Sequence, residues 1–575
     1  MKRVFRYCKP YLAIIIVALV MKIGGAVLDL LIPSTLADII DVAVPSGVMR
    51  NIVIMGLTMA LFAVSEMILN FLSNLIVTRV ANRVVETMRQ DLFKKVTSLS
   101  ARQMDEVTVS SAVSRLTSDT YNVLHMIGRV LRMGIRAPIL MIGGLMVTAF
   151  EDPVLALILV VALPLVAWVM VGLTKKAIPQ HKKKQTILDR MIRTVQENAT
   201  GIRVIKALSK TDYEMDRYDK VNKELADKGL EASLITAKTR PLVNIIFYCS
   251  LVGVILVGAL RVNSGDMQPG KIVAFMSYFT LIVNATMGIS SVFVMCSTGS
   301  ASASRISEVM DMDEAMQLQK FAEEHTEYAL ELRNVSFSYN GVEPNLTNVS
   351  VKMKKGQTLG IIGATGSGKT TLVNLLLRFY DVDEGQILLD GRDIRSIPNE
   401  ELRTMFGVAF QNDFLVADTV AQNIDFYRGL SDDALRKAAV LAQAEAFIAE
   451  KEGGMEYLLT VKGNNLSGGQ RQRLLIARAL AARPKILILD DSSSALDYQT
   501  DAKLRKALAE ENFAETTKII IAQRVSSIRG ADCIMVLDGG EVIGQGTHEE
   551  LMATCEEYQH IAHIQMETEE VTANG

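Results

Sequence analysis

Long apolar runs fill the first half of the chain, and their pattern predicts six membrane-spanning helices. A helix needs about 20 mostly apolar residues to cross a bilayer. Six stretches meet this requirement, near Tyr11–Ile32, Ile52–Val77, Leu131–Phe150, Val154–Leu173, Leu242–Val262 and Ile272–Cys296. Short links join the spans in pairs, whereas long polar stretches separate the second span from the third and the fourth from the fifth.

The two long polar stretches also have a helical pattern. Apolar residues recur at helical spacing, with charges between them, around Val80–Val96 and Leu188–Leu208. We therefore expect spans two to five to continue as helices beyond the membrane. Independent surface helices are the alternative interpretation.

Basic residues gather in the long stretches and are few in the short links. Because cytoplasmic segments carry an excess of Lys and Arg, this bias predicts a multi-pass protein of the cytoplasmic membrane with both termini in the cytoplasm. Lys2, Arg3 and Arg6 at the N-terminus agree with this orientation. The basic residues of the long stretches are Arg83, Arg89, Lys94, Lys95, Arg102, Arg115, Lys175, Lys176, Lys182, Lys183, Lys184, Arg190, Arg193, Lys206 and Lys210.

Composition supports a membrane part joined to a soluble part. The 575 residues are 49% apolar, yet 22% are charged. The net charge of −2 gives no indication of nucleic-acid binding. The basic and apolar N-terminus resembles a signal peptide, but no small-x-small cleavage site follows, so we interpret it as a retained first span. Five scattered cysteines without a CxxC pair predict free thiols rather than disulfides or a zinc site.

Polar residues inside the spans are candidate functional residues, because burying them in lipid is costly. Lys22 and Asp29 are seven residues apart and share a helix face, and Glu66 and Asn70 are four apart. Asn284 lies in the sixth span. Lys22 and Asp29 could contact a substrate, or they could simply pair with each other.

Short strands alternate with helices after the last span. Ala301–His325 is typical of a helix followed by a connector, and the α/β alternation begins near Glu327. The predicted fold is an α-helical six-span transmembrane domain followed by an α/β P-loop nucleotide-binding domain. We place the transmembrane domain at 1–300, the connector at 301–326 and the nucleotide-binding domain at 327–575.

The segment Gly363–Thr370, GATGSGKT, matches the P-loop pattern G-x-x-x-x-G-K-[ST]. A predicted strand, Thr358–Ile362, precedes it, and a predicted helix, Thr371–Phe379, follows. Backbone N–H groups and the helix N-terminus of such a loop bind phosphates. Lys369 is expected to reach the β- and γ-phosphates of ATP, and Thr370 to help hold Mg²⁺. The predicted ATP ligands here are Gly363, Thr365, Gly366, Ser367, Gly368, Lys369, Thr370 and Thr371.

The apolar run Ile486–Leu489 predicts a buried parallel strand that ends in Asp490. Ligands bind at the carboxyl ends of such strands. Asp490 is therefore the expected carboxylate of the magnesium site.

A third motif, Leu466–Gln470, reads LSGGQ and precedes a predicted helix, Arg471–Ala481. Ser467, Gly468, Gly469 and Gln470 would place backbone donors at a helix start, which suits a γ-phosphate. With this motif the sequence resembles the ATP-binding cassette (ABC) family, of which LSGGQ is the signature. Six spans before one cassette resemble a type IV exporter half-transporter, and the resemblance covers essentially the whole chain.

The resemblance implies roles for further residues. Tyr339 matches the aromatic residue that stacks on adenine, and Gln411 matches the glutamine that senses the γ-phosphate and Mg²⁺. Ser494–Asp497 matches the loop that communicates between the two ATP sites of a cassette pair. In the family each ATP lies between one P-loop and the partner's signature. Short coupling helices in the cytoplasmic loops would fall near Met104–Val109 and Ser209–Tyr218.

The sequence departs from the family at two catalytic positions. Asp491 stands where the family usually has Glu as general base, and its side chain is one methylene shorter. Gln523 stands where the family has the switch histidine, and an amide cannot take up a proton near neutral pH. A smaller departure is Thr460–Gly463, which lacks an expected acidic residue. Asp491, Gln523 and Gln411 are thus the candidate catalytic residues of a degenerate site.

These departures lead to a hypothesis about assembly and function. The chain would bind ATP and hydrolyse it slowly, while its intact signature completes a competent site on a different half-transporter that carries the usual Glu and His. A slow homodimer is the alternative. The expected function is ATP-driven, multidrug-type export of hydrophobic or amphipathic compounds across the lipid bilayer. A lipid or peptide exporter, an importer and an ATP-sensing regulatory subunit are the other interpretations.

Overall fold

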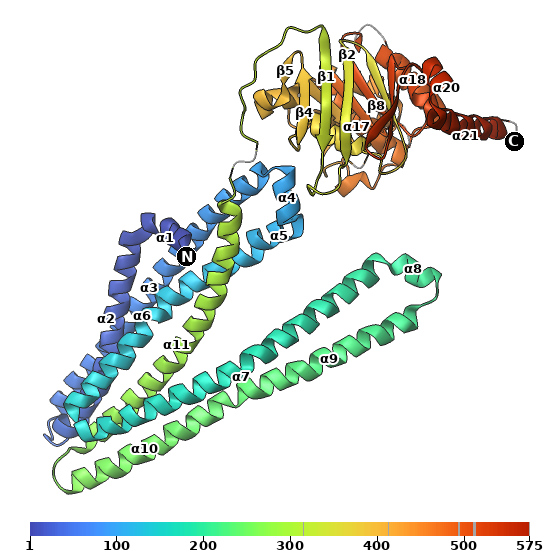
Figure 1. Cartoon of the computed structure of the whole chain (residues 1–575). Helices are drawn as coiled ribbons and strands as arrows, with labels where there is room; N and C mark the ends of the chain where they lie inside the picture. The colour runs from blue at the N-terminus through green and yellow to red at the C-terminus, as the bar shows by residue number, and fades with distance from the viewer. Residues whose placement is uncertain (314–315, 412, 493–494, 510–512, 574–575) are drawn as a thin grey trace. The chain divides into compact units, whose positions relative to one another are not determined.

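The computed structural model describes residues 1–313, 316–411, 413–492, 495–509 and 513–573, and the chain divides into two units (Figure 1). The first unit contains Met1–Thr97 and Val109–Met312, and the second contains Ser98–Thr108 and Asp313–Gly575. The short segment Ser98–Thr108 thus packs with the nucleotide-binding part of the chain, although it lies between two predicted spans.

Long helices make up the first unit. Within the described residues, six are long and apolar enough to cross a membrane, which confirms the predicted six-span fold. The helices of this unit are α1 (Lys2–Cys8), η1 (Lys9–Tyr11), α2 (Leu12–Asp38), η2 (Ile39–Ala43), α3 (Met49–Ser98), α5 (Val109–Ser114), η3 (Arg115–Asp119), α6 (Thr120–Glu151), α7 (Pro153–Thr200), α8 (Ile202–Ala207), α9 (Thr211–Ala237), α10 (Thr239–Asn263) and α11 (Pro269–Met310).

The helices extend well past the length that a bilayer requires. Helix α3 has 50 residues and α7 has 48, and at 1.5 Å per residue each is more than about 70 Å long. The continuation predicted from the polar stretches is therefore confirmed. Two short helices lie near the expected coupling segments but have other bounds. The first is Ala101–Val107, where we expected Met104–Val109, and the second is Ile202–Ala207, where we expected Ser209–Tyr218. Gly201 ends α7, and Ser209, with a positive φ of 52°, separates α8 from α9.

Two apolar clusters hold the first unit together. One joins α7, α10 and α11 around Leu159, Phe275 and Phe279. The other joins α2, α6 and α11, where the buried Tyr278 donates its hydroxyl to Leu30 O at 2.9 Å. Helix α9 runs along α7 as its antiparallel neighbour (Figure 1).

A charged cluster connects α2, α3 and α6 within the predicted spans. Arg136 Nη2 donates to Asp29 Oδ2 at 2.7 Å and to Glu66 Oε1 at 2.8 Å. Asn70 also donates to Glu66, and Lys22 Nζ donates to Asn74 Oδ1 at 3.0 Å. The hydrogen bonds of Lys22 and Asp29 thus go to different partners, and Arg136, which the sequence did not single out, holds both carboxylates.

Two sheets form the centre of the second unit (Figure 1). The antiparallel sheet has the order β2-β1-β4-β5, and the larger sheet has the order β10-β9-β3-β8-β7-β6. In the larger sheet β3, β6, β7, β8 and β9 are parallel, and β10 pairs antiparallel with β9. The strands are β1 (Tyr328–Phe337), β2 (Leu346–Lys354), β3 (Thr358–Ile362), β4 (Glu384–Leu389), β5 (Arg392–Asp393), β6 (Phe406–Ala409), β7 (Ile486–Asp490), β8 (Thr517–Ile521), β9 (Cys533–Asp538) and β10 (Glu541–Gly546). This confirms the predicted α/β domain.

Helices cover the sheets, and one group forms a separate core. Residues of α14, α15, α16 and α17 make an apolar cluster that includes Leu435, Phe447 and Leu475. The helices are α4 (Ala101–Val107), α12 (Lys369–Leu376), η4 (Ile394–Ser396), α13 (Asn399–Met405), α14 (Val420–Asp425), α15 (Asp432–Leu441), α16 (Glu445–Ala449), η5 (Gly454–Glu456), η6 (Val461–Gly463), α17 (Gly468–Ala481), α18 (Tyr498–Ala509), α19 (Val525–Ile528), α20 (His548–Thr554) and α21 (Glu556–Ala573). All five cysteines of the chain have free thiols, as predicted.

Two helix boundaries next to the motifs differ from the prediction. The P-loop helix begins at Lys369 rather than Thr371 and ends at Leu376, just before Arg378 takes a positive φ of 49°. The signature helix begins at Gly468 rather than Arg471, because Ser467 is its N-cap. In both cases motif residues form the first helical turn, where free backbone N–H groups face outward.

Candidate nucleotide-binding site

The P-loop lies between the C-terminal end of β3 and the start of α12. Gly368 is the N-cap of α12 with a positive φ of 99°, a conformation that favours glycine. A Cβ at Gly363 would lie only 2.0 Å from Leu537 O, so the neighbouring strand leaves no room for a side chain there. The loop therefore requires glycine at Gly368 because of its backbone conformation, and at Gly363 because there is no space for a side chain.

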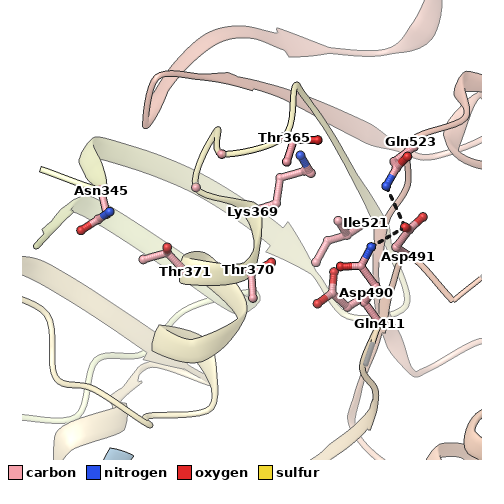
Figure 2. A pocket seen from close by; sticks show the side chains of 12 residues that line it. Asn345, Thr365, Lys369, Thr370, Thr371, Gln411, Asp490, Asp491, Ile521 and Gln523 are labelled. Carbon is pink, nitrogen blue, oxygen red and sulfur yellow. Dashed lines mark hydrogen bonds between the residues drawn. The ribbon is translucent and has the colours of Figure 1, made fainter. Parts of the chain in front are cut away.

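A cavity of about 280 Å³ opens beside this loop. Its walls bring together the P-loop, the ends of β7 and β8, and the segment after β6 (Figure 2). The lining residues are Asn345, Thr365, Gly366, Gly368, Lys369, Thr370, Thr371, Gln411, Asp490, Asp491, Ile521 and Gln523. Residues from five separate segments of the sequence thus meet at one site, at the carboxyl edge of the parallel strands.

Lys369 is folded back onto the P-loop. Its Nζ donates to Gly363 O at 2.8 Å and to Ala364 O at 2.6 Å, and Ser367 Oγ lies 3.3 Å away. Burial lowers the pKa of Lys369, and the negative charges of Asp490 and Asp491 oppose this shift. The ammonium group is therefore held against the backbone of the P-loop, the segment that is expected to bind phosphates.

Asp490 ends β7 and is 4% exposed. Burial and the adjacent Asp491 raise the pKa of its carboxyl, while Lys369 lowers it. Thr370 and Gln411 line the same cavity. A hydroxyl, an amide oxygen and a carboxylate are the oxygen ligands that Mg²⁺ accepts next to substrate phosphates, so these three residues fit the ion.

Asp491 accepts two hydrogen bonds on one carboxylate oxygen. Gln411 Nε2 donates to Asp491 Oδ2 at 2.9 Å, and Gln523 Nε2 donates to the same atom at 2.8 Å (Figure 2). The backbone of Asp491 has a positive φ of 47°, and its N–H donates to Ile521 O at 2.9 Å. Burial raises the pKa of Asp491. The hydrogen bond from Gln411 is the largest of the neighbouring contributions that lower it.

The signature motif lies outside this cavity. Among the residues that the structure describes, those lining the cavity include none of Ser467, Gly468, Gly469 and Gln470. Instead these residues form a capping box: Ser467 Oγ accepts from Gln470 N at 3.3 Å, and Gln470 Oε1 accepts from Ser467 N at 3.1 Å. The start of α17 is thus preorganised, but it is not part of the described wall of the chain's own cavity.

Tyr339 is also absent from the described lining of the cavity, but it is connected to it. Its backbone N–H donates to Asn345 Oδ1 at 3.0 Å, and Asn345 lines the cavity. Its hydroxyl accepts from Asn374 Nδ2 at 3.0 Å. The side chain is 38% exposed, so ring surface is available for a base.

Sequence reasoning missed two residues of the cavity, Asn345 and Ile521. Asn345 lies in a loop before β2, where no motif marks it, and Ile521 is an ordinary residue of a buried strand. Ser494 of the predicted D-loop lies outside the described residues. In the described part of this loop, Leu496 is buried. The carbonyl oxygen of Ala495 lies close to Gly469 of the signature motif.

Comparisons with known proteins cover both units. Residues 15–286 match the family model of the ABC transporter transmembrane region, and residues 346–494 match that of the ABC transporter domain. The chain is 32% identical over 563 residues to the uncharacterized ABC transporter ATP-binding protein YfiB of Bacillus subtilis, covering 98% of each chain. It is 29% identical over 569 residues to an ATP-dependent lipid A-core flippase of Vibrio vulnificus, covering 98% of this chain and 97% of the relative.

A solved structure shows the same fold. The structure of a bacterial Atm1-family ABC exporter with ATP bound superposes with a TM-score of 0.82 at 23% sequence identity. The match covers 96% of this chain and 97% of that chain.

Proposed function

The chain belongs to the ABC transporter family, and we propose that it is one half of an exporter that uses ATP to move hydrophobic or amphipathic compounds across the cytoplasmic membrane. The observation that carries this proposal is the convergence of Lys369, Thr370, Gln411 and Asp490 on one cavity in a chain with six candidate spans. A chain that combines an ATP-binding cavity with membrane-spanning helices suits an ATPase that is coupled to transport.

The cavity supplies the groups that ATP binding requires. Lys369 and the backbone N–H groups at the start of α12 attract the phosphates. Thr370, Gln411 and Asp490 would hold Mg²⁺, which when bound neutralises charge on the β- and γ-phosphates. Tyr339 offers its ring to the adenine. Each of these contacts involves a residue that lies in or next to the cavity.

We further propose that this chain's own site hydrolyses ATP slowly. A general base must reach the attacking water and take its proton. Asp491 has the shorter side chain, and its Oδ2 already accepts from Gln411 and Gln523. Gln523 can donate a hydrogen bond but cannot carry a proton as the family's histidine does. A correctly placed acid–base group is worth about 10²–10⁴ in rate, and this site lacks that contribution.

The intact signature supports a role in a partner's site. Ser467–Gln470 is preorganised at the start of α17 yet lies away from the chain's own cavity. A partner P-loop could therefore use it. We propose a heterodimer in which a second half-transporter carries the usual Glu and His, because a homodimer would contain two impaired sites.

The decisive experiment measures ATPase activity of the purified chain alone and with its candidate partner. We expect little activity from the chain alone and substantial activity from the pair. In the chain alone, Asp491→Glu combined with Gln523→His should raise the activity. Brisk activity of the unmodified chain, little changed by the double substitution, would mean a homodimer with a competent site.

Lipid export is a second candidate function, favoured by the full-length similarity to proteins named lipid A-core flippases. A fluorescent-lipid flipping assay in proteoliposomes, beside a drug-uptake assay in inside-out vesicles, separates the two. ATP-dependent movement of the lipid alone would replace the multidrug proposal. Labelling of single cysteines placed at the two ends of the chain would test the cytoplasmic location of both termini.

A further inference from the structure

A second cavity of the nucleotide-binding unit lies at the other end of two strands that lead to the nucleotide cavity. Its volume is about 430 Å³, and its wall includes Thr358, the first residue of β3, and Lys518, the second residue of β8. These two residues are register partners in the parallel pair β3–β8. The carboxyl ends of the same strands lead to Gly363 and Gln523. In the described part of the chain, the linings of the two cavities share no residue.

Small residues leave the space for this cavity. Gly356, Ala514, Gly530 and Ala531 are part of its wall. A Cβ at Gly356, where φ is +84°, would lie only 2.2 Å from Ala514 O. The wall on this side is therefore made by closely packed backbone, and the cavity belongs to the fold of the unit.

Lys518 is a buried lysine of this wall without a counter-ion. It is 7% exposed, whereas the side chain of Lys485, just before β7, is 64% exposed and pairs with Asp390 at 2.9 Å. Among the described residues, the ammonium of Lys518 has no hydrogen-bond or ion-pair partner. A lysine normally keeps its ammonium in water, and burying the three donors unpaired is costly. The cavity is the space that this ammonium can share with a ligand.

The carboxylates near the cavity are engaged with other groups. Asp501 Oδ2 accepts from Arg505 Nη2 at 3.1 Å and from Ser527 Oγ at 3.3 Å, so the charge of Arg505 is compensated. Asp532 Oδ2 accepts from Thr358 N at 2.7 Å. Burial lowers the pKa of Lys518, and the negative charge of Asp532 opposes this shift without cancelling it. One cationic group of the cavity thus remains uncompensated.

We propose that this cavity binds a small monocarboxylate with an apolar body, and that the carboxylate pairs with Lys518. One negative charge matches the one uncompensated cation, whereas a phosphate dianion would bring an excess charge. Leu508 and Ile520 provide apolar wall for the body of the ligand. A volume of about 430 Å³ lies in the usual range of small-molecule sites, which combine apolar walls with few polar groups.

Lysine acetylation with N-acetoxysuccinimide, read by mass spectrometry on the full chain in lipid nanodiscs, tests the inference. The probes are benzoate, its neutral analogue benzamide and inorganic phosphate. Because ligands of this size bind weakly, each is used at about 10 mM. We expect benzoate to slow the acetylation of Lys518 by about threefold or more at this concentration, and benzamide and phosphate to have little effect. Lys506, exposed on α18, is the matched control and should react equally in all samples.

Thermal unfolding provides a second readout. Lys518→Met keeps the length of the side chain and removes the unpaired ammonium, so it should raise the melting temperature in the absence of ligand. Benzoate should raise the melting temperature of the unmodified chain and leave that of Lys518→Met unchanged. Lys506→Met removes an exposed charge instead, and it should behave as the unmodified chain in both samples.

Three results would overturn the inference. Equal effects of benzoate and benzamide would mean that the cavity does not recognise charge, and equal effects of benzoate and phosphate would mean a general anion site. Absence of any benzoate effect on both acetylation and melting would mean that no carboxylate binds. Binding of MgATP is measured on the same samples, and its absence would contradict the proposed function alone, because the two cavities are separate.

Discussion

Gln523 donates its amide N–H to the carboxylate of Asp491 across 2.8 Å, at the place where the family has a histidine beside a glutamate. Gln411 donates to the same oxygen at 2.9 Å. Both amides donate to the same oxygen, Oδ2, of a carboxylate that has acceptor sites on two oxygens. The two hydrogen bonds fix the orientation of the Asp491 carboxylate and compete with water for Oδ2.

The first prediction concerns Asp491 in the complex with the partner chain. Asp491→Asn should change the ATPase rate by less than about twofold, whereas loss of a working general base costs about 10²–10⁴. An asparagine oxygen can accept the same two hydrogen bonds, and Asn tolerates the positive φ of 47° at this position. The measurement is steady-state ATPase activity of the purified pair. A hundredfold loss would show that Asp491 is a working base.

The second prediction tests whether the signature acts on another chain's ATP. Ser467→Ala removes the capping box of α17 and should cost about 1 kcal/mol of stability. It should also strongly reduce the ATPase of the pair while leaving ATP binding by the chain alone unchanged, because Ser467 does not line its cavity.

Thr547→Ala is the matched control for this prediction. Thr547 forms the same type of capping box with Glu550 at the start of α20. The substitution should cost a similar amount of stability and leave the ATPase of the pair unchanged. Equal ATPase losses in the two variants would mean that Ser467 acts only through the stability of the fold.

Local sequence patterns predicted the parts of this molecule that depend on neighbours in the chain. The strand Thr358–Ile362 has the predicted bounds, because its short apolar run ends directly before Gly363, where the P-loop begins. The continuous helices α3 and α7 followed from apolar periodicity. The motifs also identified ten of the residues that line the nucleotide cavity.

Contacts between distant segments could not be predicted in this way. Arg136 pairs with Asp29 and Glu66 across three helices, and sequence spacing carries no information about such a meeting. The hydroxyl of Tyr380 donates to the carboxylate of Asp105, although the two residues are 275 positions apart in the chain. The packing of Ser98–Thr108 with the second unit likewise depends on tertiary contacts. The heterodimer and the slow hydrolysis remain predictions, since they depend on a second chain.

The third prediction concerns pH and Asp490, whose pKa is raised mainly by burial. The folded state then binds this proton more tightly than the unfolded state. The associated stability is complete below the ordinary carboxyl pKa of about 3.9 and is lost as the pH rises through the folded value. Without nucleotide, Asp490→Asn should therefore be more stable than the unmodified chain at pH about 7, and the gain should shrink toward pH about 4.

Thermal unfolding at the two pH values measures this effect. The control is Asp538→Asn, at the exposed end of β9, which should show no gain. With MgATP present the order should reverse, because Asp490→Asn removes the carboxylate that would hold Mg²⁺. A gain of equal size at both pH values would contradict the burial argument.

The last prediction concerns the charged cluster of the membrane unit. Arg136→Gln leaves Asp29 and Glu66, which are 17% and 19% exposed, without their shared cation. Removal of one partner from a partly buried ion pair leaves an uncompensated charge, and we expect a loss of about 3 kcal/mol, at the low end of the range for buried pairs. The melting temperature in lipid nanodiscs should fall accordingly.

Charge removal distinguishes this explanation from a loss of packing. Neutralising both carboxylates in the same variant, with Asp29→Asn and Glu66→Gln, should restore most of the stability, because no stranded charge remains. Arg129→Gln, two turns earlier on α6 at an exposed position, should have little effect. If the triple variant melts as low as Arg136→Gln alone, the arginine stabilises α2, α3 and α6 through its packed side chain, and the two carboxylates contribute no net repulsion in its absence.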